Sequence, residues 1–282
     1  MFGNLNRAYA GVGSSSWKDI AVGGGFSLAI KMDDTLWAWG KSPSKLNDFS
    51  DIISISSGYG NNLISAKKDG TVWTLDRGKA IQIQNLNDVV AVAAASYDFY
   101  ALKKDGTVWI FGSNGVGKVA GESVHKQYSP KIVEGIADVV TIQATAGGPL
   151  YLKKDGTVWA SGRNSGGQLG IGSYEDSNVP VQVKGLHKII KIAAHGTGFR
   201  SRAIREDETL FSWGGGFTGD GTKWYRTESV WIKSSESDDF VENLINVTVN
   251  GKLLEFEQLP VLVDGTTMVS LRKIFKLRGK MR

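Results

Sequence analysis

The chain has 282 residues, of which 41% are hydrophobic, no cysteine, and a formal net charge of +5 at pH 7. The lack of cysteine excludes disulfides, thiolate metal sites and a cysteine nucleophile, and no apolar run reaches the roughly 18 residues that a membrane span requires. Six basic residues and no acid lie in the last eleven positions, so the rest of the chain is close to neutral and offers no extended basic surface for nucleic acid. The six are Arg272, Lys273, Lys276, Arg278, Lys280 and Arg282.

Residues 1–16 precede the first recognisable pattern. They begin Met-Phe-Gly-Asn-Leu-Asn-Arg and lack the basic head and apolar stretch of a secretory signal. We expect this segment to be a leader or the remnant of a preceding unit.

A six-residue phrase recurs along the chain. Lys-Asp-Gly-Thr-Val-Trp occupies residues 68–73, 104–109 and 154–159, and related versions occupy 32–37 and 206–211. A β-branched run comes before each of the last four copies. Short runs rich in β-branched and aromatic residues, separated by glycine-containing turns, predict strands. The recurrence predicts stacked units that share one core.

The Asp-Gly pair inside the phrase predicts a tight turn. A two-residue hairpin of the primed type needs positive φ at both central residues, which Asp tolerates and Gly adopts without steric cost. We therefore expect the flanking segments, such as 102–104 and 107–111, to pair as the two arms of a hairpin.

The spacing of the phrase predicts the architecture. Its aromatic residue recurs after about 36 residues in the first units and about 50 in the later ones, between residues 17 and 233. Units of this length with three or four antiparallel strands are typical of propeller blades. We predict an all-β fold: a β-propeller with five recognisable blades over residues 17–233, with the ring either closed or incomplete, followed by a truncated β-rich module.

The last part of the chain follows a different pattern. Residues 234–243 are polar and predict a linker. Residues 244–282 carry two strand-and-turn signals, at Asn250-Gly251 and Asp264-Gly265. About 39 residues bury too little core to be stable alone.

The most detailed unit reads Leu152-Lys-Lys-Asp-Gly-Thr-Val-Trp-Ala-Ser-Gly-Arg-Asn-Ser-Gly-Gly-Gln-Leu-Gly170, with Pro180 after it. This string resembles the repeat of the regulator of chromosome condensation family, and the resemblance covers about residues 17–233. It implies a β-propeller, commonly of seven blades, so five units leave the closure of the ring open.

Two further resemblances concern location. Lys-Lys-Asp-Gly-Thr-Val-Trp is the version of the repeat seen in bacterial surface proteins of this family. Residues 247–252 and 260–272 are similar to the copper amine oxidase N-terminal-like domain, a non-catalytic stalk module, which implies a partial copy over residues 244–282 and a Gram-positive envelope protein. Residues 275–282 depart from that domain, and we expect a truncated or frame-shifted end whose basic character is an accident.

Two other patterns resemble functional motifs. Residues 112–118 fit the phosphate-binding Gly-x-x-x-x-Gly-Lys, but Val119 replaces the hydroxyl residue and Lys118 takes the place of Gln168 in the clearest repeat, which favours a structural loop. The repeated aspartates could form a ring of metal ligands, but a turn alone explains an Asp before a Gly. These aspartates are Asp33, Asp69, Asp105, Asp155 and Asp207.

The three histidines do not form a zinc pattern. His125, His187 and His195 are too scattered, although His195 stands in a glycine-rich corner where the resemblance implies a structural histidine. Neither a Gly-x-Ser-x-Gly elbow nor an Asn-Tyr-Asp cofactor precursor is present. We therefore predict a protein that is not an enzyme, and we name no catalytic, cofactor-binding or metal-binding residue and no cofactor.

The regularly spaced tryptophans allow two interpretations. Such rings can pack blade against blade, each burying about 150–250 Å², or they can form a platform that stacks on sugars. We favour packing because large aromatic areas dominate the energetics of cores. The four residues are Trp37, Trp73, Trp109 and Trp159.

Together the patterns favour a non-catalytic binding scaffold, extracellular or on a bacterial cell surface. Its propeller loops are expected to hold a protein or glycan partner, with no nucleic acid partner and no membrane span. Two alternatives stay open: a guanine-nucleotide-exchange or chromatin-binding regulator, as the founding family member implies, and a propeller enzyme with an unrecognised central site.

Overall fold

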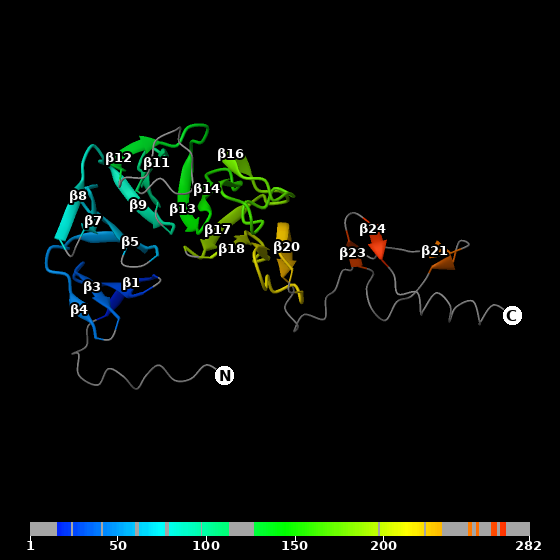
Figure 1. Cartoon of the computed structure of the whole chain (residues 1–282), viewed down its shortest axis with the longest axis horizontal. Helices are drawn as coiled ribbons and strands as arrows, with labels where there is room; N and C mark the ends of the chain where they lie inside the picture. Colours follow the sequence, from blue (N-terminus) through cyan, green and yellow to red (C-terminus); the bar gives the residue numbers. More distant parts are fainter. Residues whose placement is uncertain are drawn as a thin grey trace. The chain divides into compact units, whose positions relative to one another are not determined.

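The computed structural model (Figure 1) describes residues 16–232, except 24, 41, 60–61, 77–78, 97, 113–126, 197 and 223, together with four short strands between residues 248 and 268. The chain divides into the units Met1–Lys233 and Ser234–Arg282. None of the described segments is a helix that could span a bilayer.

Unit Met1–Lys233 contains five four-stranded antiparallel sheets, which we call blades 1 to 5 in chain order. The prediction of an all-β propeller with five blades is confirmed. The strands of blade 1 are β1 (Trp17–Val22), β2 (Ser27–Lys31), β3 (Leu36–Trp39) and β4 (Ser44–Lys45); of blade 2, β5 (Ile52–Ser57), β6 (Leu63–Lys67), β7 (Val72–Asp76) and β8 (Lys79–Ile83); of blade 3, β9 (Val89–Ala94), β10 (Asp98–Lys103), β11 (Val108–Gly112) and β12 (Gln127–Ile132); of blade 4, β13 (Val139–Thr145), β14 (Gly148–Lys153), β15 (Val158–Gly162) and β16 (Ser177–Gln182); and of blade 5, β17 (Ile189–Ala194), β18 (Arg200–Arg205), β19 (Leu210–Gly214) and β20 (Arg226–Ile232).

In unit Ser234–Arg282 the described strands form two antiparallel pairs. Strand β21 (Thr248–Val249) pairs with β22 (Lys252–Leu253), and β23 (Val261–Val263) pairs with β24 (Thr266–Met268). The Asn-Gly and Asp-Gly turns expected between these strands, the expected linker and the basic end lie outside the described residues.

The blades follow one another along an arc, and the first strands of successive blades, β1, β5, β9, β13 and β17, contact each other (Figure 1). Because the strands run antiparallel in chain order, the hairpin turns between second and third strands lie at the same end of the sheets as the connections between blades. We call this end the turn face. The loops between first and second strands, and between third and fourth strands, lie at the opposite end, the loop face.

The core is divided into four apolar clusters, one between each pair of consecutive blades. Between blades 4 and 5, side chains of β14 and β15 that face blade 5 pack against β17 and the facing side of β18 and β19. Burying one such aliphatic or aromatic side chain stabilises the fold by about 1.5–3 kcal/mol. The residues of this cluster are Leu150, Leu152, Val158, Ala160, Leu169, Val183, Leu186, Ile189, Ile192, Ala203, Phe211 and Trp213.

The repeated tryptophans lie at the margins of these clusters. Trp73, Trp109 and Trp159 are only partly buried, each packed against the cluster that its own blade shares with the preceding blade. Packing between blades is therefore confirmed for these three rings. The centres of the clusters are mainly aliphatic, because two closely packed sheets leave room there for Leu, Ile and Val.

Each hairpin turn is held by a side-chain clamp. In blade 2 the Asp69 carboxylate accepts hydrogen bonds from the Thr71 hydroxyl (2.6 Å) and amide (2.9 Å), and these bonds lower its pKa. The indole Nε1 of Trp73 donates to the same hydroxyl at 2.9 Å, and Lys67 Nζ lies 4.4 Å from the indole centroid. The turn aspartates are thereby committed to the fold. Blades 1, 3 and 4 repeat these contacts.

The predicted turn type was wrong. Positive φ occurs at Gly70 but not at Asp69, the Gly70 amide donates to the Lys67 carbonyl, and the Lys67 amide donates to the Thr71 carbonyl. The loop therefore has three residues, a type I turn followed by a left-handed glycine. The reason is the clamp: an Asp side chain that bonds the amide two residues ahead needs the ordinary negative φ of an Asx turn.

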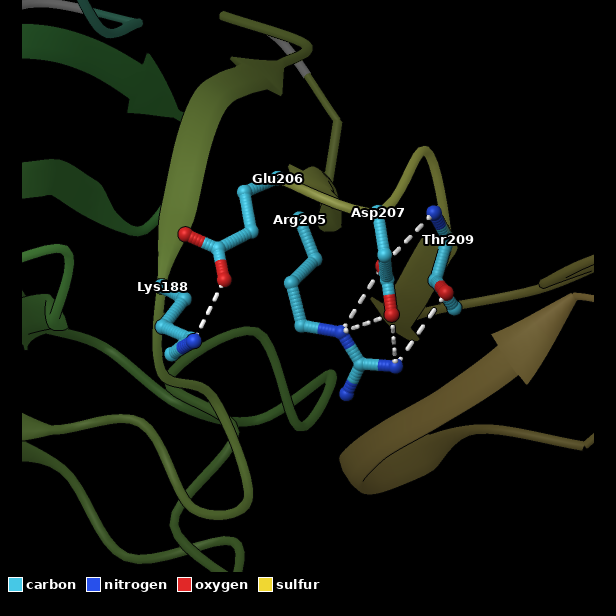
Figure 2. A network of polar contacts seen from close by, with 5 residues as sticks. All are labelled: Lys188, Arg205, Glu206, Asp207 and Thr209. Atoms are coloured by element: carbon cyan, nitrogen blue, oxygen red, sulfur yellow. Dashed lines mark hydrogen bonds and ion pairs between the residues drawn. The ribbon is translucent and has the colours of Figure 1, made fainter.

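Blade 5 keeps the clamp with different residues (Figure 2). Phe211 replaces the tryptophan, and its side chain has no N–H to donate. Instead, Arg205 Nη2 donates to the Thr209 hydroxyl at 3.2 Å, and Arg205 Nε donates to Asp207 at 2.9 Å. The guanidinium carbon lies 5.2 Å from the Phe211 centroid. Arg205 thus supplies both the cation over the ring and the donor that the indole provides elsewhere.

Backbone hydrogen bonds connect each turn to the next blade. The Val89 amide of blade 3 donates to the Gly70 carbonyl of blade 2 at 3.2 Å, and the Val139 amide of blade 4 donates to the Gly106 carbonyl of blade 3 at 3.1 Å. Asp88 has a φ of 56°, and a Cβ on Gly70 would lie 2.7 Å from the Asp88 nitrogen. The glycine is therefore required by its left-handed conformation and by the close approach of blade 3.

We predict that Gly70→Ala lowers the free energy of unfolding by about 1–3 kcal/mol, measured by urea denaturation. Gly221→Ala is the matched control, because Gly221 also has positive φ (82°) but nothing lies within 4 Å of its added Cβ. The control should lose only the conformational part, about 1 kcal/mol. Equal losses in the two variants would show that the close approach to Asp88 contributes nothing.

Candidate functional site

A pocket of about 370 Å³ opens on the loop face of blade 5. The loop between β17 and β18 supplies one wall, and the loop between β19 and β20 supplies the other. The lining residues are His195, Gly198, Phe199, Arg200, Gly215, Gly216 and Tyr225.

Glycines allow the two loops to approach each other. The Gly215 amide donates to the Phe199 carbonyl at 2.8 Å, and Arg200 Nε donates back to the Gly215 carbonyl at 3.0 Å. A Cβ on Gly215 would lie 2.7 Å from the Tyr225 ring, and one on Gly216 would lie 2.8 Å from Arg200 Nη2. The Arg200 guanidinium therefore lies along the backbone of Gly215 and Gly216, and it lines the same pocket as Tyr225.

Aromatic side chains around this pocket are unusually exposed. Phe199 and Tyr225, which line it, are 38% and 52% exposed, and Phe217 and Trp224 on the β19–β20 loop are 61% and 75% exposed. Large aromatic side chains leave water readily when a partner covers them, and clustered exposed rings mark interaction surfaces. The pocket itself combines the Phe199 and Tyr225 rings with the His195 imidazole and the Arg200 guanidinium.

The β19–β20 loop is held by a charged network around Asp220. Its carboxylate accepts hydrogen bonds from the Thr218 hydroxyl (2.9 Å) and from the Thr222 hydroxyl (2.9 Å) and amide (3.1 Å), and it forms an ion pair with Arg226. Burial acts to raise the pKa of Asp220, but these hydrogen bonds and the bond from Arg226 Nε outweigh it and lower the pKa to about 2. The loop that carries Phe217 and Trp224 is thus fixed at its base.

The motif of the clearest repeat closes the β15–β16 loop of blade 4 and attaches it to blade 5. Asn164 is fully buried and binds the Ser173 carbonyl and the Leu169 amide, which closes the β15–β16 loop. Trp213 Nε1 donates to the Gln168 carbonyl at 2.9 Å, so this loop is attached to blade 5. Asn164 is therefore architectural, since its side-chain oxygen and nitrogen both bond to the backbone of its own loop.

The two histidines that the structure describes lie at different faces of the propeller. His195 lies at the pocket, His187 is exposed on a connection of the turn face, and His125 lies outside the described residues, as do residues 113–118 of the phosphate-loop pattern. Among the residues that the structure describes, no three His, Cys, Asp or Glu side chains come together as metal ligands.

Sequence reasoning did not find Arg200, Tyr225 or the neighbouring rings. The available signal was a departure from the repeat: the segment 214–225 keeps the glycines but places three aromatic residues in a loop where the clearest repeat has only a tyrosine, Tyr174. Their convergence with Phe199 depends on the contact between two loops, which no local pattern reveals.

We predict that Asp220→Asn lowers stability at pH 7 by about 1–2 kcal/mol, because one pKa unit corresponds to about 1.4 kcal/mol and the group is partly hydrated. The folded pKa of about 2 lies below the ordinary 3.8, so the carboxylate stabilises the fold above that range and loses its effect as the pH falls towards 2. Urea denaturation between pH 7 and 2.5 should therefore show the variant and the original chain converging.

Glu228→Gln serves as the control, since it removes an exposed ion pair with Lys184 and should change stability by less than about 1 kcal/mol. A constant difference between Asp220→Asn and the original chain at every pH would contradict the role assigned to the carboxylate.

Known proteins resemble this chain in one repeat and in the overall fold of the propeller. Residues 155–198 match the family model of the Regulator of chromosome condensation (RCC1) repeat. No curated protein sequence matches the chain.

Solved structures share the fold. Yeast RCC1 (Prp20), in a crystal structure of Kap60 bound to it, is 19% identical with a TM-score of 0.67, over 79% of this chain and 62% of that one. Prp20p from Saccharomyces cerevisiae, described with its binding properties to Gsp1p and histones, is 20% identical with a TM-score of 0.66, over 78% and 64%. Human WBSCR16 is 16% identical with a TM-score of 0.67, over 78% and 68%.

The chain spans less than two thirds of the length of the two yeast chains. At these identities the likeness establishes the fold alone. Residues 155–198 thus match the family model of the RCC1 repeat, and the chain shares the fold of these solved structures.

Proposed function

We propose that the chain is a non-catalytic scaffold that binds a protein partner on the loop face of blade 5. The observation that carries the proposal is the group of exposed rings around a pocket that also contains Arg200 and His195. Binding energy in protein interfaces is concentrated in aromatic and arginine side chains. The rings here are attached to loops that hydrogen bonds already order, so little entropy is lost on binding.

The arrangement of the two faces supports the same proposal. On the turn face, the Asp, Thr, Trp and Lys side chains of the repeated phrase contact each other in the clamp, so they are used for the fold. On the loop face of blade 5 the rings of Phe217 and Trp224 lie largely in solvent. A propeller that holds a partner through loops leaves its repeat intact and varies those loops.

Proteins with this fold also bind other proteins. Yeast RCC1 (Prp20) binds Kap60, and Prp20p was studied for binding to Gsp1p and histones. A partner-binding role for this chain agrees with that use of the fold. The alternative functions are exchange of guanine nucleotide, binding of chromatin, turnover of a substrate and binding of a glycan.

We predict that Phe199→Ala, Trp224→Ala and Tyr225→Ala each weaken binding to a protein partner by about tenfold or more, as expected of interface anchors. The measurement is isothermal titration with a partner identified by proximity labelling and then purified. Trp231→Ala is the control: Trp231 is 53% exposed on β20 of the same blade, away from the two loops.

A partner that binds all four variants equally would place the interface elsewhere. A glycan that binds in place of any protein, or a GTPase whose nucleotide release the chain accelerates, would replace this proposal with one of its alternatives.

We also propose that the protein is secreted or lies on a bacterial cell surface. The support is the resemblance of the repeat phrase and of residues 247–252 and 260–272 to envelope proteins. Protease added to intact producing cells should then digest the protein while a cytoplasmic marker survives. Survival of both would argue against this location.

A further inference from the structure

One face of blade 1 is apolar and exposed. Ile20 of β1 pairs with Ala29 and is 68% exposed, and Val22 is 74% exposed. Strand register identifies the residue that corresponds to Ile20 in each other blade. All four of these residues are buried against the preceding blade. They are Ile55, Val92, Ile142 and Ile192, with exposed fractions of 8%, 6%, 3% and 3%.

Three tryptophans complete this face. Trp17 lies 6.3 Å from Trp37 and 6.2 Å from Trp39, centroid to centroid, and Lys31 Nζ lies 4.0 Å from the Trp37 ring. We call Trp17, Ile20, Val22, Trp37 and Trp39 the blade 1 edge. No described residue of another blade covers Ile20 or Val22.

Blade 5 exposes the side that, in blades 1 to 4, packs against the following blade. In blade 4 the residues Leu150, Leu152 and Val158 are buried against blade 5. Their counterparts by register in blade 5 are Arg202, Ile204 and Leu210. Leu210 is 36% exposed, and Val230 and Ile232 lie beside it on β20. We call Arg202, Ile204, Leu210, Val230 and Ile232 the blade 5 edge.

The two edges are complementary. All four interfaces inside the chain join the aliphatic side of one blade to the first strand and third-strand ring of the next. Among the described blades, the blade 5 edge and the blade 1 edge are the two halves left without a neighbouring blade. Each edge differs from the corresponding side of an internal interface. On the blade 5 edge Arg202 stands where blade 4 has Leu150. The blade 1 edge has Trp17 and Trp39, whose indole faces attract a guanidinium such as that of Arg202.

We propose that the blade 5 edge of one copy of this chain packs on the blade 1 edge of a second copy, head to tail. Each copy carries one half of each kind, so the contact is heterologous, and one pair leaves one edge of each kind open. The second copy is favoured over an unrelated partner because the complementary surface is already encoded in the chain.

The chain has no cysteine, so single cysteines can test the geometry directly. Ile20→Cys and Ile204→Cys are purified separately, mixed and oxidised with copper phenanthroline, and disulfide-linked dimers are measured on a non-reducing gel. The proposal expects dimers from the mixture and few from either variant alone. Dimers from Ile20→Cys alone would show that two blade 1 edges meet, which overturns the head-to-tail arrangement.

Two outcomes point to other occupants. A monomer with an internal disulfide in the Ile20→Cys, Ile204→Cys double variant would show that the edges meet within one chain. Protection of the Ile20→Cys thiol from maleimide in a strictly monomeric sample would show that another part of the same chain covers the edge. Either result overturns the proposal.

A second measurement does not depend on oxidation. Sedimentation velocity over a dilution series should show self-association, with Ile20→Asp and Arg202→Glu raising the dissociation constant by about tenfold or more. Ile190→Asp is the matched control, because Ile190 is 62% exposed on β17 but belongs to neither edge, and it should leave association unchanged. A monomer at every concentration would overturn the proposal.

Discussion

Burial between neighbouring blades is the interaction on which the rest of this structure depends. A four-stranded sheet of this repeat is apolar on both sides, so no blade is stable until a neighbour covers it. Leu150 and Ile192 illustrate this, since each is fully or almost fully buried only because blades 4 and 5 meet. The close approach of turn and blade at Gly70 and Asp88 follows from the same requirement, because sheets that pack tightly bring their ends together.

The repeat separates structural and variable positions at its two faces. On the turn face the Asp–Thr–Trp clamp and the bonds between blades use the polar groups of the phrase, and even where Phe211 replaces tryptophan, Arg205 restores the lost donor. On the loop face the connections vary in length, from the short 146–147 to the long 163–176. The pocket with Arg200 and Tyr225 occurs there because substitutions in these loops do not disturb the packing between blades.

Much of the fold could be predicted from the sequence because the phrase recurs. Strands, hairpins and the number of blades follow from local patterns such as Asp69-Gly70 and the β-branched run before it. The turn type could not, because the bond from the Thr71 amide to Asp69 decides it against the usual Asp-Gly preference. The pocket could not either, since Phe199 and Tyr225 meet only through tertiary contact, and no spacing in the sequence encodes that distance.

Exposed edges distinguish a capped repeat array from one that can associate. A capping blade would carry polar residues across its uncovered side. Blade 1 instead exposes Ile20 and Val22, and blade 5 keeps Ile204 and Leu210 while changing one position to Arg202. An arginine among aliphatic residues weakens indiscriminate apolar contact but favours a surface rich in indole, such as that of Trp17 and Trp39. Arg202 therefore restricts the blade 5 edge to partners with aromatic surfaces, while Ile204 and Leu210 keep that edge apolar enough to bind them.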